Sequence, residues 1–222
     1  NGKGIEVPHA LVMRGAIPIP EEETTQIYLN PAELAAMYRL DLSKQPRLDR
    51  ARDLFIVGTW TGLRFGDLSR VRPEHIEGVR IKVPTAKTGK EVRIPLHPHV
   101  REILTKYEGG FPSGISNQKQ NKYIKEVAAL VPALQEKVMT GRTQGGKHVE
   151  APSAKWELVT THTARRSFAT NLYQQGIPAR TIMTVTGHRT ERAFMGYIRL
   201  SPDEHMDLIA HSPLFQLAPM KV

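Results

Sequence analysis

A change of hydrophobic period in the middle of the chain limits which folds this sequence can adopt. Residues 79–83 and 91–95 alternate apolar with polar side chains on either side of a turn that contains Lys87-Thr88-Gly89-Lys90. A period of two is typical of half-buried strands, so this stretch predicts a β-hairpin. Before and after it, apolar residues recur at the three-to-four spacing of helices that bury one face. The sequence therefore predicts a mostly α-helical α+β domain with small β elements.

Capping residues indicate where several of the predicted helices begin. Asn30 precedes Pro31 and Glu33, an arrangement that predicts a helix N-terminus with a capping box. Ser201-Pro202-Asp203-Glu204 predicts the start of the final helix in the same way. A second pair of strands is expected within 138–159, with Gly145-Gly146 at the turn and Trp156 to Val159 as the returning strand. The other predicted helices span about 48–60, 66–71, 98–106, 117–130, 163–175, 178–186 and 190–199.

Length and composition fit one domain with short appendages. With 222 residues, of which 40% are hydrophobic, the chain can bury a sizeable core. Residues 1–26 contain prolines, glycines and the run Glu21-Glu22-Glu23, so we expect an N-terminal arm or interdomain linker there. Residues 27–222 would then form the domain, followed after its last helix by an apolar tail with Leu214, Phe215 and Leu217.

The chain is strongly basic and contains no cysteine. Its 31 Lys and Arg residues exceed its 22 Asp and Glu residues, which gives a formal net charge of +9. This excess favours a polyanionic partner, because lysine and arginine near phosphates release condensed counterions. The lack of cysteine excludes a disulfide scaffold, a thiolate metal site and a cysteine nucleophile. Neither a membrane-spanning apolar stretch nor a signal peptide is evident, so we expect a cytoplasmic protein without a membrane partner.

Two segments place arginines where a helix is expected to begin. Thr61-Gly62-Leu63-Arg64 forms a turn into a helix, with Asp67 three residues further on. His162 and Arg165 share one face at the N-terminal end of another predicted helix. Helix N-termini favour anions, and a guanidinium adds paired donors for a phosphate. Each pattern alone also fits a surface arginine on an ordinary turn or cap.

Three further residues complete a set that can act on a phosphate. Lys87 lies at the tip of the predicted hairpin, where exposed lysines are common. Tyr197 follows Gly187-His188 on the next predicted helix, where a tyrosine buried in the core is the simpler interpretation. Together, two arginines, two histidines, a lysine and a tyrosine are the groups that phosphoryl transfer without a metal requires. A two-metal nuclease is disfavoured, because no carboxylate cluster has metal-ligand spacing.

These segments, in this order, resemble the catalytic domain of the tyrosine recombinase (phage integrase) family over about residues 27–210. They resemble in turn the family's boxes for its first arginine, its lysine, its histidine with the second arginine, its second histidine and its nucleophile. The region from Phe194 to His205 looks most similar to integrases of conjugative and other integrative elements. The matching segments are Thr61-Gly62-Leu63-Arg64 with Asp67, Ala86-Lys87-Thr88-Gly89-Lys90, His162-Thr163-Ala164-Arg165 followed by Ser167-Phe168-Ala169-Thr170, Gly187-His188 and Tyr197.

The resemblance implies site-specific recombination of double-stranded DNA. Tyr197 would attack a scissile phosphate and form a 3′-phosphotyrosine with a free 5′-hydroxyl. Arg64 and Arg165 would hold the phosphate, and Lys87 would protonate the leaving 5′-oxygen. A 5′-hydroxyl from a partner strand would reverse the step and exchange strands. The family acts as a tetramer on two duplexes through a Holliday junction, and the isolated domain is expected to be a monomer.

Supporting roles follow from the same resemblance. His162 and His188 would assist by hydrogen bonding or proton transfer, while Asp67, Lys90 and Arg166 would contact DNA or support the site. Neither a metal nor ATP is expected as a cofactor, because the protein–DNA link stores the bond energy. The expected localisation is the cytoplasm, in association with the nucleoid.

The sequence departs from the family pattern in two respects. Position 166 is Arg where many members have His, which leaves the contact made there open. Residues 1–26 are too few for the N-terminal helical domain that grips the opposite DNA face, so we expect a catalytic fragment that binds DNA weakly and recombines poorly.

Two other functions and one structural alternative stay open. A type IB topoisomerase would share the chemistry, and a non-catalytic helix-turn-helix module would use the rhythm of residues 168–197 for DNA binding alone. The tail with Leu214, Phe215 and Leu217 would pack on a neighbouring protomer or on its own domain.

Overall fold

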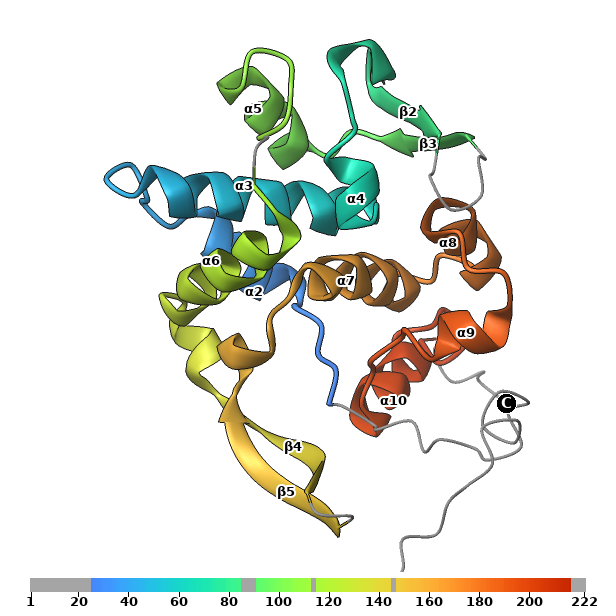
Figure 1. The fold of residues 1–222 in the computed structure, drawn as a ribbon. Helices are drawn as coiled ribbons and strands as arrows, with labels where there is room; N and C mark the ends of the chain where they lie inside the picture. Colours follow the sequence, from blue (N-terminus) through green and yellow to red (C-terminus); the bar gives the residue numbers. More distant parts are fainter. Residues whose placement is uncertain (1–24, 85–90, 113–114, 145–146, 217–222) are drawn as a thin grey trace, which may run out of the picture.

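The computed structural model describes residues 25–84, 91–112, 115–144 and 147–216, the side chains of 142–148 excepted. A helical body carries a small antiparallel sheet at one end and a two-stranded hairpin at the other (Figure 1). The predicted mostly helical α+β class is confirmed. The described helices are α2 (Pro31–Tyr38), α3 (Pro46–Thr61), α4 (Phe65–Leu68), α5 (Pro98–Lys106), α6 (Asn117–Ala129), α7 (Thr161–Gln174), α8 (Ala179–Thr186), α9 (Glu191–Met195) and α10 (Pro202–Ala210), with short 3-10 turns at η1 (Pro73–His75), η2 (Pro132–Gln135) and η3 (Lys155–Leu158).

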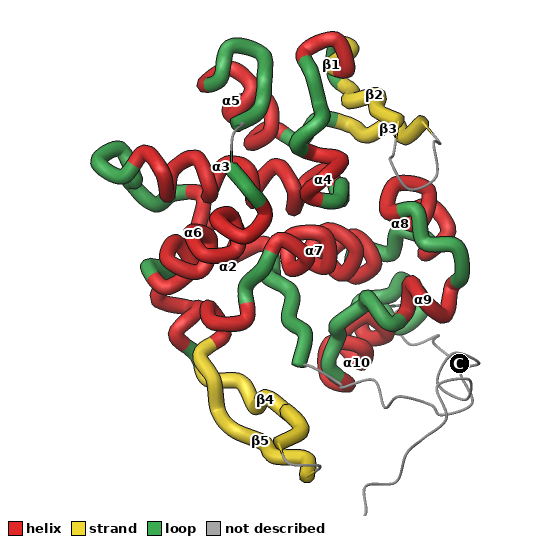
Figure 2. Tube along the Cα trace, in the orientation of Figure 1, coloured by secondary structure: helices red, strands yellow, loops and turns green. Residues whose placement is uncertain are grey.

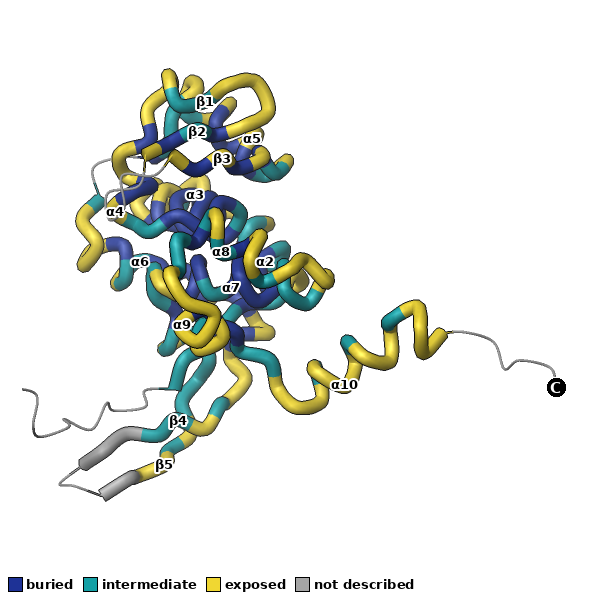
Figure 3. Tube along the Cα trace, turned by 90° about the vertical axis from the view of Figure 1, so that its right-hand side faces the viewer, coloured by how far each residue is buried: buried dark blue, intermediate teal, exposed yellow. Residues whose placement is uncertain are grey.

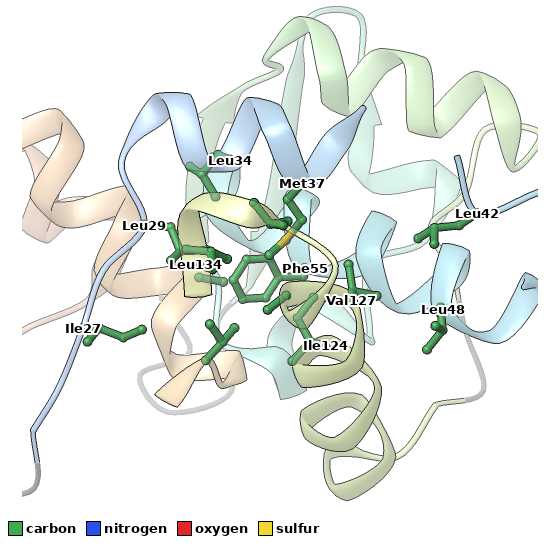
Figure 4. Packing of buried hydrophobic residues seen from close by; sticks show 14 residues of the cluster. Ile27, Leu29, Leu34, Met37, Leu42, Leu48, Phe55, Ile124, Val127 and Leu134 are labelled. Carbon is green, nitrogen blue, oxygen red and sulfur yellow. The ribbon is translucent and has the colours of Figure 1, made fainter. Parts of the chain in front are cut away.

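Helix α3 runs through the centre of the body and contacts α2, α5, α6 and α7 (Figure 2). Its neighbouring residues Phe55 and Ile56 belong to two different hydrophobic clusters. The Phe55 cluster, drawn in Figure 4, joins α2, α3 and α6. Helix α7 approaches α3 closely at Gly58, where an added Cβ would lie 3.2 Å from the Cβ of Ala164. Because other helices pack on several sides of α3, its C-terminal end is held in place and positions the segment that follows it.

The predicted β-hairpin is present as two strands of a three-stranded sheet, in which β2 is the middle strand and β3 an edge strand. Strands β2 (Arg80–Pro84) and β3 (Glu91–Pro95) pair in antiparallel register, with Ile81 opposite Ile94. Their alternate residues are buried against α3 and α5, which is the arrangement that the period of two predicts. The short strand β1 (Ile76–Glu77) adds to β2 and was not predicted, because two residues are too few to display a period.

The second pair of strands is confirmed, but its predicted returning segment is wrong. Strands β4 (Lys137–Gln144) and β5 (Lys147–Ala154) form a hairpin that extends away from the body (Figure 3). The return is β5, and Trp156 lies instead on the 3-10 turn η3. In a strand, Leu158 and Val159 would face opposite sides, whereas this tight turn lets both pack against the Phe55 cluster.

The structure also corrects the ends of four helices. Helix α7 begins at Thr161, two residues before the predicted start, so His162 lies within the helix. Helix α3 begins at Pro46, two residues before the predicted start. Helix α4 ends at Leu68 rather than at residue 71, because the next residues form tight three-residue turns. Helix α9 ends at Met195, so Tyr197 lies in the following turn and not within the predicted 190–199 helix. The backbone N–H of Arg199 donates to Thr170 on α7 over 3.3 Å, and this contact draws the chain back onto the body.

The C-terminal helix α10 is held mainly by its first turn. Ser201 and Glu204 form the predicted capping box. The Glu204 carboxylate also accepts hydrogen bonds from the Tyr28 hydroxyl and from the Gln174 side chain. None of the α10 residues is buried, and the helix points away from the body (Figure 3). No described helix is both long enough and apolar enough to cross a membrane.

Among the glycines that the structure describes, Gly62 should be the position at which the fold tolerates a side chain least. Its φ of +63° is left-handed, and an added Cβ would lie 2.4 Å from Cδ1 of Phe168. We predict that Gly62→Ala lowers the free energy of unfolding by about 2 to 4 kcal/mol, from backbone strain and overpacking together. Urea denaturation measures this loss. Gly66→Ala is the matched control, because nothing lies within 4 Å of a Cβ there. Equal effects of the two substitutions would contradict the prediction.

Candidate active site

The end of α3 positions Arg64. Gly62 closes the helix in the left-handed conformation, and its N–H donates to the carbonyl of Gly58. The chain then turns so that Arg64 becomes the N-cap residue of α4, with its backbone extended. Arg64 is half-buried and lines a cleft of about 290 Å³ with residues from α4, α6 and α7. The sequence TGLR is therefore a helix end, a turn and a helix start, which together bring one guanidinium to the cleft.

Arg165 lies beneath the same cleft and is only 3% exposed. One terminal nitrogen donates to the carbonyl of Gly62 over 2.6 Å, and the other donates to the carbonyl of Thr186. Burial first, and the nearby Arg64 second, lower the pKa of Arg165 to about 10. The guanidinium therefore stays charged at neutral pH, but it lies where a positive charge is poorly solvated. An anion in the cleft would offset that unfavourable solvation.

His162 lines the cleft and also contacts Tyr197. The His162 Nδ1 lies 3.1 Å from the Tyr197 hydroxyl, within hydrogen-bond distance. His162 is on the first turn of α7, and Tyr197 comes from the turn after α9. Desolvation, with the positive charges of Arg166, Arg165 and Arg64, lowers the pKa of His162. Its imidazole is therefore neutral at pH 7 and can accept a proton.

The ring of Tyr197 is surrounded by cations and a second histidine. The His188 ring lies 4.8 Å from it, centroid to centroid. The Arg165 and Arg166 guanidinium carbons lie 6.0 Å and 5.7 Å from the ring centroid, near enough for cation–π attraction. Tyr197 is thus half-buried in the site rather than in the hydrophobic core.

The remaining predicted residues lie around this group. His188 follows the left-handed Gly187, and its Nδ1 lies 2.9 Å from the Thr186 hydroxyl. Asp67 is buried, pairs with Arg70 at 2.5 Å and favours the charged form of Arg165. Arg166 donates to the carbonyl of Ile27 over 3.4 Å, and burial lowers its pKa.

The structure brings together Arg64, His162, Arg165, His188 and Tyr197. Lys87 and Lys90 lie outside the described residues. Two residues at the cleft, Asn117 and Thr161, were not predicted from the sequence. Helix α6, which carries Asn117, has no recognisable motif, and a threonine at the start of a helix is ordinarily interpreted as a capping residue. Within the described ranges, no group of three His, Asp or Glu side chains is placed to hold a metal ion. The residues that line the cleft are Arg64, Phe65, Gly66, Asn117, Thr161, His162 and Arg165.

The sequence matches the Phage integrase family over residues 27–204, and the chain belongs to this family. Tyrosine recombinase XerD of Chlamydia pneumoniae is 27% identical over 190 residues, which cover 83% of this chain and 62% of that protein. The integrase of Escherichia phage P2 is 24% identical over 203 residues, covering 91% of this chain and 51% of that one. The chain therefore spans between half and two thirds of the length of these relatives.

Solved structures share the fold. The crystal structure of XerA recombinase superposes with a TM-score of 0.58 at 18% identity, covering 85% of this chain and 67% of that one. The catalytic domain of bacteriophage HP1 integrase gives a TM-score of 0.51 at 14% identity, covering 86% of this chain and 97% of that one. The predicted fold, that of a tyrosine recombinase catalytic domain, is confirmed.

The lowered pKa of His162 can be measured directly. Histidine NMR titration should give a pKa of His162 below the ordinary 6.5. Arg166→Met should raise this pKa, because it removes the neighbouring positive charge that lowers it most. As pH falls, the unfolded chain takes up this proton before the folded one, so His162 makes the fold less stable through that range. Arg180→Met is the control, because Arg180 is an exposed residue of α8 paired with Glu191. A wild-type pKa at or above 6.5 would contradict the prediction.

Proposed function

We propose that this chain is the catalytic domain of a site-specific recombinase, which cuts and rejoins double-stranded DNA through a 3′-phosphotyrosine link. One observation carries the proposal: the Tyr197 hydroxyl lies 3.1 Å from His162 Nδ1, beside a cleft lined by Arg64 and Arg165. A tyrosine with only a packing role in the hydrophobic core would not place its hydroxyl beside His162 and the two arginines. The domain would span residues 27–222, with 1–26 as an arm or interdomain linker.

The chemistry begins with a phosphodiester held by Arg64 and Arg165. The Tyr197 oxygen attacks phosphorus while its proton passes to the neutral His162. Negative charge grows on the non-bridging oxygens, and the two guanidinium groups stabilise it. The bond to the 5′-oxygen breaks, and Lys87 supplies a proton to that leaving group. His188, packed on the Tyr197 ring, holds the phenol in line.

The second half of the reaction runs the same steps in reverse. A 5′-hydroxyl attacks the phosphotyrosine, Tyr197 leaves, and the proton returns to it from His162. Attack by the original strand reseals the DNA, whereas attack by a partner strand recombines it. The phosphotyrosine keeps the energy of the broken phosphodiester, so the proposed reaction consumes no ATP. The arginines supply the charge stabilisation that a metal ion provides in other enzymes. The proposed mechanism therefore includes no metal ion.

Double-stranded DNA is the proposed partner. The net charge of +9 suits a polyanion. XerH was solved bound to its difH substrate, and a lambda integrase dimer was solved bound to a COC′ core site. By analogy, we infer that this chain acts on a duplex, as a tetramer on DNA and a monomer alone. Association with the nucleoid would follow from the same affinity.

The test is covalent capture. A library of duplexes of randomised sequence, each nicked near a fixed position, is incubated with the chain, and adducts that survive denaturation are sequenced. We expect the wild-type chain to form an adduct, because the short strand beyond the nick diffuses away and cannot reseal. Tyr197→Phe should form none, since it lacks only the attacking oxygen.

The other functions give different outcomes of the same experiment. A helix-turn-helix module would shift duplexes equally for both chains and form no adduct. A type IB topoisomerase would form the adduct, but it would also relax plasmids that lack the captured sequence. Either result would overturn the proposed recombinase function.

The exposed tail supports contact between copies rather than packing on its own domain. Leu214 and Phe215 are 74% and 66% exposed, whereas Leu217 lies outside the described residues. We predict that a chain ending at residue 210 stays monomeric on captured duplex, because it lacks this apolar segment, while the full chain forms larger complexes. Light scattering with and without DNA measures this. Leu214→Ser with Phe215→Ser should behave like the truncation; equal assembly of all three chains would contradict trans packing.

A further inference from the structure

We propose that Asn117 is a third phosphate ligand of this site, donating from its Nδ2 to a non-bridging oxygen of the phosphodiester held by Arg64 and Arg165. This inference rests on the proposed function and adds a binding residue to it. Asn117 is the first residue of α6, an element that carries none of the residues predicted from the sequence. It nevertheless lines the same cleft as both arginines and His162, and its side chain is exposed to solvent there.

A hydrogen bond to α7 fixes the orientation of the Asn117 amide. Its Oδ1 accepts from the Thr161 hydroxyl over 3.1 Å. One turn further along α6, the Oδ1 of Asn121 accepts from the backbone N–H of Thr161 over 2.8 Å. Because the amide is planar, engaging Oδ1 also sets the direction of Nδ2. Within the part of the chain that the structure describes, Nδ2 has no hydrogen-bond acceptor, so both of its protons can serve a ligand.

The charges around the cleft explain why an amide suits this position. Arg64 already lowers the pKa of Arg165, and both lower the pKa of His162. Arg166 lowers the pKa of His162 as well, so a further cation lining the cleft would add to the repulsion and would hinder proton uptake by His162. A neutral amide supplies a donor without that repulsion. The three donors come from α4, α6 and α7, so they approach a phosphate from different directions and define its position.

Thr161 joins this ligand to the reacting groups. It directly precedes His162, and its hydroxyl and backbone N–H are held by the two asparagines of α6. A phosphate that bonds to Asn117 is therefore placed relative to the residue that contacts the nucleophile. A purely structural role for Asn117 would need only its Oδ1, and this difference allows a test.

The test compares Asn117→Asp with Asn121→Asp on the duplex captured by the wild-type chain. Both changes keep an oxygen that accepts from Thr161 and add the same charge to the same helix. Only Asn117→Asp removes a donor from the cleft and faces the phosphate with a carboxylate. We expect it to slow single-turnover cleavage by about 100-fold or more, since a hydrogen bond to a charged group contributes about 10- to 100-fold and repulsion adds to the loss. Asn121→Asp should stay within about threefold of wild type. Thermal unfolding of both variants checks that they fold.

A substrate change separates ligand from scaffold. In a methylphosphonate duplex, one non-bridging oxygen of the scissile phosphate is replaced by methyl. On the normal duplex, Asn117→Ala is expected to slow single-turnover cleavage by roughly 10- to 100-fold. With one of the two methylphosphonate diastereomers this defect should fall to about threefold or less, because the oxygen that Asn117 would bond is already missing from the substrate. An unchanged defect with both diastereomers, or equal rates for the two Asp variants, overturns the proposal while leaving the recombinase function intact. Failure of the wild-type chain to form any adduct overturns both.

Discussion

The guanidinium of Arg165 lies at the carboxyl ends of two helices, where it donates to the carbonyl of Gly62 beyond α3 and to that of Thr186 at the end of α8. The helix dipoles make both ends negative, which favours a cation there. Each helix closes on a left-handed glycine, so the backbone turns sharply at the bonded residue itself, Gly62, or directly after it, at Gly187. Arg64 and His188 follow within two residues of these carbonyls. One buried side chain therefore fixes segments from three parts of the sequence.

The same arrangement crowds positive charge in a poorly solvated place. The charges of Arg166, Arg165 and Arg64 all lower the pKa of His162. The pKa of Arg165 is itself lowered, first by burial and then by Arg64. Helices α3 and α7 pack against each other more extensively than any other pair of described helices, and this burial opposes the repulsion. A phosphate bound in the cleft, as proposed, would relieve it, and a ligand that binds only the folded state also stabilises that state. Binding and folding would then be linked through these few charges.

Local patterns were enough to predict most of the secondary structure. The alternation in 79–95 located the hairpin, and the capping boxes at Asn30 and Ser201 located two helix starts, because these signals depend on neighbouring residues alone. The end of α9 could not be predicted in this way, since it depends on the contact between Arg199 and Thr170, which are far apart in sequence. Trp156 was assigned to a strand for a similar reason, because its conformation depends on packing against core residues that are distant in the sequence.

The candidate site divides along the same line. Motif and order identified the residue types, whereas the burial of Arg165 and the contact between His162 and Tyr197 depend on how α7, α8 and α9 pack. Asn117 has no motif at all and becomes visible only when α6 is placed beside α7.

The carboxylate of Glu204 has a mechanical consequence for the domain. It bonds to Tyr28 near the first described residue and to Gln174 at the end of α7, while beginning the last helix itself. Both ends of the domain are thereby tied to the helix that carries His162 and Arg165. A load applied to α10 by a neighbour, or to residue 25 by whatever precedes it, therefore converges on α7. It does so through this carboxylate and, from the N-terminal side, also through the direct hydrogen bonds of Leu29 with Ser167 and Asn171. Tension on either end of the chain is thus transmitted to the same helix.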